Sequence, residues 1–84
     1  MVDEDSVVDV KASKPYILEV TFAGGFRGRI NVEPQLWGEL FEPLRDPKMF
    51  MQARFDPDFG TVVWPNGADL SPEFIAETAL ATPA

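Results

Sequence analysis

The side chains that most often carry enzyme chemistry are missing from this sequence. It contains no histidine and no cysteine, which excludes the commonest general base, the commonest metal ligand and any thiol nucleophile. Its serines fall at a predicted strand edge (Ser6), a loop (Ser13) and a helix cap (Ser71), each of which explains the residue without catalysis. Gly24-Gly25 opens a predicted strand rather than a helix, unlike a phosphate-binding loop.

Asp and Glu carboxylates are the remaining candidates for a metal-binding or catalytic role. Asp56 and Asp58 are spaced to meet at a turn, but the later glutamate of a calcium-binding loop does not follow them, and turn formation explains both. Glu39 and Glu42 lie in an irregular segment, where we expect solvated side chains rather than a glycosidase-like pair. The sequence therefore predicts a non-enzymatic protein with no catalytic residue, no metal site and no cofactor.

Basic side chains are few, and several share one predicted face. Seven Lys and Arg stand against fourteen Asp and Glu, a net charge of −7, which argues against nucleic-acid binding by the molecule as a whole. Strand alternation places on the outer face of the predicted sheet Lys11, Arg27, Arg29 and Arg54, together with Asp9, Glu19 and Asp56. This face is either a solvated surface with weak charge pairs or a contact surface that orients a partner.

The charged residues of this outer face lie on strands that are predicted from alternating apolar and polar side chains. Residues 6–12, 16–22 and 26–32 each repeat apolar side chains with a period of two. Because directly paired residues share a face, a loop at 23–25 pairs Phe22 with Phe26, Val20 with Gly28, Leu18 with Ile30 and Glu19 with Arg29. By the same argument a loop at 13–15 pairs Val10 with Leu18 and Val8 with Val20.

The middle of the chain predicts short helices and irregular backbone. Pro34 fits a first helical position and Gly38 a helix end, and Asp46 fits the cap of a second short helix over residues 47–52. The apolar residues between these helices are expected to cross the core, and they are Leu40, Phe41 and Leu44.

The last third predicts a second hairpin and a helix. Residues 53–56 and 61–64 flank a turn at 57–60, which pairs Phe55 with Val62 and Ala53 with Trp64. Ser71 caps a helix over residues 72–80. Leu70 and Ile75 are spaced for a hydrophobic staple across its first turn. The fold class is therefore α+β, a mainly antiparallel sheet of about five strands with short helices on one face. The predicted core side chains are Tyr16, Leu18, Val20, Phe22, Ile30, Phe55, Val62 and Trp64.

Length and composition predict one small domain over residues 1–84, with residues 1–5 and 82–84 as loose tails. The acidic start is the opposite of a signal peptide, and no apolar run approaches the ~20 residues of a membrane helix. Absence of cysteine favours a reducing compartment. We therefore expect a cytoplasmic protein with no membrane partner.

Three sequence blocks resemble a known family. They are VTFAGG at 20–25, FEPLRDP at 41–47 and GTVVWPNGADLSPEF at 60–74, of which the string from Trp64 to Leu70 is the most specific. Over about residues 7–80 the chain is similar to the bacterial domain-of-unknown-function family 2442 (DUF2442). The resemblance implies a small α+β domain, similar to the N-terminal domain of longer members that carry a helix-turn-helix. It implies no catalytic residues, and a gene arrangement like a toxin–antitoxin pair.

Two functional hypotheses follow. The first is a protein-interaction or accessory module, in specific form the neutralising, antitoxin-like partner of a small basic protein encoded nearby. The alternative is a nucleic-acid-associated regulatory domain that uses the outer sheet face, although this chain ends before a helix-turn-helix begins, so nucleic acid is not the partner expected of it alone. A homodimer through the edge of the strand at 61–64, or across Val7, Ile17 and Val63, is a further hypothesis. Trp64, Asn66 and Asp69 are interpreted as turn and capping residues, with a small recognition corner as the alternative.

Overall fold

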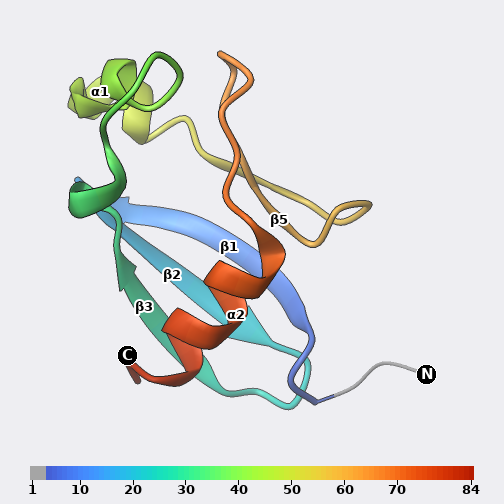
Figure 1. Cartoon of the computed structure of the whole chain (residues 1–84). Coiled ribbons are helices and arrows are strands. Elements are labelled where there is room, and N and C mark those ends of the chain that lie inside the picture. The colour runs from blue at the N-terminus through green and yellow to red at the C-terminus, as the bar shows by residue number, and fades with distance from the viewer. Residues whose placement is uncertain (1–3) are drawn as a thin grey trace.

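Five strands form two separate antiparallel sheets in the computed structural model, which describes residues 4–84 (Figure 1). β1 (Val7–Lys14), β2 (Ile17–Phe22) and β3 (Arg27–Asn31) make the first sheet in the order β1-β2-β3. β4 (Arg54–Asp56) pairs with β5 (Thr61–Val63) in the second. The α+β class and the antiparallel pairing are confirmed, but the prediction of one five-stranded sheet is wrong.

The C-terminal residues occupy the β3 edge of the first sheet, so no further strand joins the sheet there. The amide of Arg29 donates to the carbonyl of Thr82 (2.8 Å), and the amide of Ala84 donates to the carbonyl of Arg27 (3.0 Å). The β4–β5 hairpin instead packs against β1. Residues 82–84 are therefore part of the sheet's hydrogen bonding and not the loose tail that the sequence predicts; of the other predicted tail, residues 1–3 lie outside the described residues.

The register of β2 against β3 is confirmed. Leu18 pairs with Ile30, Glu19 with Arg29 and Val20 with Gly28. The loop at 23–25 closes as predicted, because the Phe22 amide donates to the Phe26 carbonyl (2.9 Å). Gly25 has a φ of +96°, the left-handed conformation that a three-residue hairpin loop requires.

The register of β1 against β2 differs from the prediction by two residues. Val10 pairs with Val20 and Ala12 with Leu18. The connection is a two-residue turn between Lys14 and Ile17, and an irregular step between Ala12 and Lys14 adds one residue to β1. Together these keep Val10 on the core face with a different partner. A second irregular step leaves Val8 44 % exposed rather than in the core.

The segment between β3 and β4 contains two 3₁₀ helices, η1 (Glu33–Gln35) and η2 (Glu42–Arg45), and a short helix, α1 (Pro47–Phe50). Asp46 caps α1 as predicted, accepting from the Lys48 amide (3.0 Å), but the helix ends two residues early. Leu44 is buried and Phe41 is partly buried, whereas Leu40 is exposed and does not cross the core.

The last helix, α2 (Pro72–Leu80), covers the inner face of the first sheet, lying over β3 and β2 (Figure 1). The Ser71 hydroxyl accepts from the Phe74 amide (3.1 Å), so the predicted cap is confirmed. Leu70 and Ile75, the two residues of the predicted staple, are both buried. No helix in the described part of the chain is long and apolar enough to cross a membrane.

The core lies between the first sheet, α2 and the β4–β5 hairpin. Six of the eight predicted core side chains are buried, while Tyr16 and Phe55 are partly buried and pack against the others. The predicted pairing of Phe55 with Val62 is confirmed. The indole nitrogen of Trp64 donates to the Phe50 carbonyl (2.9 Å), which ties β5 to α1. The prediction that the outer edge of the strand at 61–64 is free is wrong, because the Trp64 backbone amide donates to the Ala68 carbonyl (2.9 Å).

We predict that Gly28→Ala dislodges α2. A Cβ at Gly28 would stand 2.0 Å from the Ala79 carbonyl oxygen, a backbone atom that can move only if the helix moves. Such overpacking costs about 1–3 kcal/mol or more, a large share of the roughly 5–15 kcal/mol that stabilises a domain. Urea denaturation followed by circular dichroism measures the loss. Gly24→Ala is the control, since its Cβ would first meet a side-chain atom of Glu4 at 3.0 Å; equal losses in the two variants would contradict the prediction.

Candidate functional site

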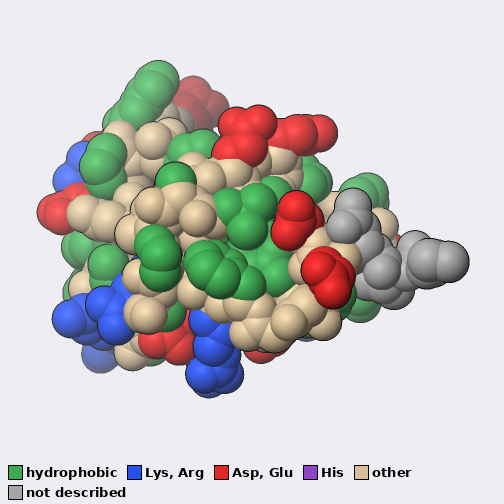
Figure 2. Space-filling view, turned by 90° about the horizontal axis from the view of Figure 1, so that it is seen from below, with side chains coloured by type: hydrophobic (Ala, Val, Ile, Leu, Met, Phe, Trp, Pro, Cys, Tyr) green, Lys and Arg blue, Asp and Glu red, His purple; other side chains and the backbone are tan. Residues whose placement is uncertain are grey.

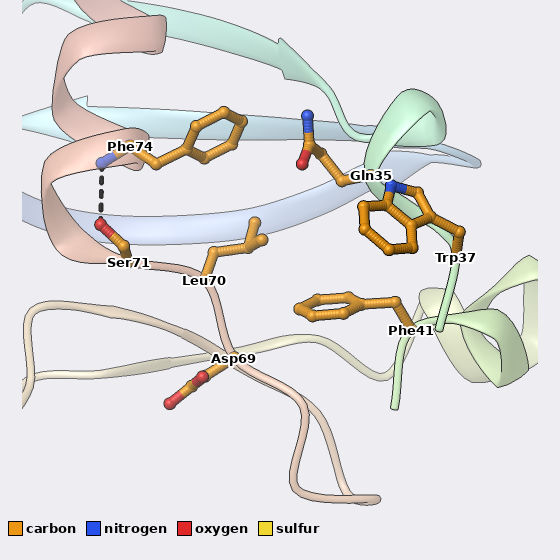
Figure 3. A pocket seen from close by; sticks show the side chains of 7 residues that line it. All are labelled: Gln35, Trp37, Phe41, Asp69, Leu70, Ser71 and Phe74. Atoms are coloured by element: carbon orange, nitrogen blue, oxygen red, sulfur yellow. Dashed lines mark hydrogen bonds between the residues drawn. The ribbon is translucent and has the colours of Figure 1, made fainter. Parts of the chain in front are cut away.

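An apolar hollow of about 450 Å³ lies between the segment that follows β3 and the start of α2 (Figure 3). Aromatic and aliphatic side chains form most of its wall. The lining residues are Gln35, Trp37, Phe41, Asp69, Leu70, Ser71 and Phe74. In Figure 3 the rings of Trp37, Phe41 and Phe74 surround a common space, and the Asp69 carboxylate points away from them.

The loop that carries Trp37 is fixed at both ends. The Arg45 guanidinium donates to the Leu36 backbone carbonyl through Nε (2.7 Å). The side-chain amide of Asn66 donates to the Leu40 backbone carbonyl through Nδ2 (2.8 Å). Leu36 is fully buried, which anchors the chain immediately before Trp37. The Trp37 side chain is nonetheless 71 % exposed. The indole is therefore presented to solvent by a loop that is already ordered.

The opposite wall includes the end of the string from Trp64 to Leu70. The side-chain Oδ1 of Asn66 accepts from the Ala68 backbone amide (3.1 Å), which shapes the turn after Trp64. The Thr61 hydroxyl donates to the Leu70 carbonyl (2.6 Å) and holds the chain as it enters α2. Of the predicted recognition corner, Trp64 is buried and Asn66 bridges two loops, so both serve the structure, while Asp69 is exposed at the hollow.

Trp37, Phe41 and Phe74 were not predicted as site residues from the sequence. One signal could have found Trp37, which lies between Pro34 and Gly38 in a segment with neither strand alternation nor a long helical repeat. A large aromatic residue in such a segment has no regular element to bury it.

The segments that line the hollow are acidic throughout. Residues 33–42 and 69–74 contain no Lys or Arg, and their carboxylates are all exposed. These carboxylates belong to Glu33, Glu39, Glu42, Asp69 and Glu73. A backbone hydrogen bond at Glu73, followed by the bond from the Ser71 hydroxyl (2.9 Å), lowers the pKa of Glu73 from its ordinary value. Exposed carboxylates therefore predominate in these two segments, and the Arg45 guanidinium is a cation that lies against one of them, at the Leu36 carbonyl.

The predicted basic face is only partly realised. Lys11, Glu19 and Arg29 stand side by side across β1, β2 and β3, so a carboxylate separates two of the cations. Arg27 pairs with Thr21 in the next row of the same sheet. Arg54 belongs to the second sheet, opposite Val63, and is not part of these rows. Figure 2 shows one face of the molecule, where most Asp and Glu side chains lie at the upper and right margins and Lys and Arg gather toward the lower side.

The wall of the hollow is mostly apolar and carries few polar groups. Asp69 is its one charged lining residue, and the remaining polar residues are an amide and a hydroxyl already used in the helix cap. Over residues 4–84 no group of three or more carboxylates is placed to hold a metal ion. The arrangement suits binding, through apolar contact and aromatic faces.

We predict that Glu73→Gln removes a pH-dependent part of the stability. Because the folded pKa of Glu73 is lowered, its contribution is complete above the ordinary carboxyl pKa and is lost as the pH falls through the folded value. The variant should therefore melt below the parent near neutral pH, and the two melting temperatures should converge in acid. Glu77→Gln, one turn further along α2, is the control. A difference in melting temperature that does not shrink on acidification would contradict this role.

Comparison with known proteins identifies a family. The family model described as a protein of unknown function (DUF2442) matches residues 7–80. No curated protein and no solved structure matches the chain significantly. The matched range includes both segments that line the hollow.

Proposed function

Because this chain belongs to the DUF2442 family, whose function is unknown, we propose a function from its own surface: it is a protein-interaction module that binds its partner at the apolar hollow. The observation that carries this proposal is Trp37, 71 % exposed on a loop held by Arg45 and Asn66. Tryptophan is among the residues that contribute most to protein interfaces. An ordered loop loses little conformational entropy on binding, which favours affinity.

The shape of the hollow favours a protein over a small enclosed ligand. Its volume of about 450 Å³ falls in the range of small-molecule sites, but one wall is an indole that is mostly in solvent. A ligand of that size would leave much of the ring uncovered. A protein surface can cover the ring and fill the hollow with one side chain at the same time.

The outer sheet face supports nucleic-acid binding less well. The chain has a net charge of −7, and Glu19 stands between Lys11 and Arg29 on that face. Phosphate contacts require cations that are not neutralised by neighbouring carboxylates. The hollow therefore takes precedence over the sheet face as the working surface.

A partner is suggested by the gene arrangement that the family resemblance implies. In its specific form the proposal makes this chain the neutralising, antitoxin-like member of a two-gene pair, which binds the adjacent small protein. Its own net charge of −7 favours a basic partner.

We predict that co-expression with the neighbouring gene product gives a stable complex on gel filtration. Trp37→Ala should weaken that complex by at least about tenfold, the loss typical of a central interface tryptophan. Phe59→Ala is the matched control, because Phe59 is 72 % exposed in the β4–β5 turn, away from the hollow lining. No complex with the parent chain would contradict the two-gene form. A complex that is insensitive to Trp37→Ala would contradict the hollow as the contact surface.

A further inference from the structure

We propose that the hollow recognises an arginine side chain of the partner, carried on a segment whose neighbouring residues are apolar. This inference rests on the proposed function and deepens it, because it names the chemistry that the hollow selects. The site comprises the rings of Trp37, Phe41 and Phe74, with Gln35 and Asp69 at its margin.

The three rings offer their π-systems to one space. Trp37 and Phe41 come from the loop after η1, and Phe74 comes from α2 (Figure 3). An aromatic face attracts a cation electrostatically, most strongly when the ring is an indole. Arginine suits such a site better than lysine, since its planar guanidinium stacks on rings and is more weakly hydrated. The apolar stem of the same side chain packs on Leu70 and the rings.

The charge around the hollow selects for a cation. The two lining segments carry five exposed carboxylates and no Lys or Arg. Asp69 is the one of these that lines the hollow, and its carboxylate points away from the rings. It is therefore placed to pair with basic residues that flank the inserted arginine. The Gln35 amide can accept a hydrogen bond from a guanidinium inside the hollow.

The start of α2 does not turn the hollow into an anion site. Pro72 has no amide hydrogen, and the Phe74 amide already donates to the Ser71 hydroxyl (3.1 Å). The Ser71 hydroxyl in turn donates to the Glu73 carboxylate (2.9 Å), which places a negative charge at the helix start. An anionic ligand would meet that carboxylate and Asp69.

The test uses the full chain and a set of matched peptides. The probe is an acetylated, amidated heptapeptide with a central arginine flanked by alanine and leucine. Its variants carry lysine or the uncharged isostere citrulline at the same position. Tryptophan fluorescence reports binding directly, since Trp37 is exposed whereas Trp64 is 3 % exposed. Isothermal titration calorimetry covers the variants that lack Trp37.

We expect the arginine peptide to bind at least tenfold more tightly than the citrulline peptide, with lysine between them. Trp37→Leu and Phe74→Leu should each weaken arginine binding by at least about tenfold, and Asp69→Asn should weaken it severalfold. Phe59→Leu and Asp58→Asn, an exposed ring and an exposed carboxylate in the β4–β5 turn, should leave it unchanged. Thermal melts of each variant confirm that the fold is intact.

Two outcomes overturn the inference while leaving the proposed function standing. Equal binding of the arginine and citrulline peptides would show a purely apolar site. No arginine-peptide binding up to about 1 mM, together with a neighbouring-protein complex that still requires Trp37, would show that the partner presents different chemistry. Loss of both the peptide binding and the Trp37-dependent complex would overturn the proposed function as well.

Discussion

The contact between the last turn of α2 and Gly28 is the constraint on which the rest of the arrangement depends. The Ala79 carbonyl lies where any side chain at Gly28 would have to be, so the helix comes closer to β3 than another residue type would allow. This seating brings residues 82–84 alongside β3, where Arg29 and Thr82 hydrogen-bond through their backbones. The β4–β5 hairpin does not join the sheet at its other edge but packs on β1 as a second sheet. The close approach of α2 therefore determines what pairs with one edge of the first sheet.

The hollow depends on the position of the β4–β5 hairpin and of the start of α2. The β4–β5 hairpin leads directly into the turn at Asn66 and then into the start of α2, so its position determines where Leu70 and Phe74 lie. Asn66 reaches back to the Leu40 carbonyl and ties this turn to the loop that carries Trp37. The Asn66 side chain therefore joins the two walls, whereas apolar contacts between the walls would close the hollow. The hollow stays open to solvent because hydrogen bonds hold the backbone segments that carry its aromatic rings.

Features fixed by neighbouring residues could be predicted from the sequence, and features fixed by distant residues could not. The β2–β3 register follows from alternation and from Gly25, and the α2 cap follows from Ser71. The β1 register was mispredicted because an irregular step in β1 leaves the apolar alternation of Val10 and Ala12 intact. The division into two sheets depends on which distant segments pair, and residues 82–84 pair with β3 more than fifty positions earlier. Within the site, Asp69 was predicted from its place in a specific string, whereas the exposure of Trp37 depends on the bonds made by Arg45 and Asn66.

The uneven distribution of charge over the surface favours one orientation of a charged partner. Both segments that contribute to the hollow carry exposed carboxylates, of which Asp69 belongs to the lining itself. Lys11, Arg27 and Arg29 lie on the far side of the first sheet from α2, because their register partners alternate with core residues. Surface charge pairs contribute only about 0–1 kcal/mol each to stability, so folding alone does not require this separation. A separated field does, however, orient a charged partner during its approach. A basic segment is attracted to the acidic segments on either side of the hollow. The same acids that would weaken binding to nucleic acid therefore favour the encounter that places an arginine among the rings.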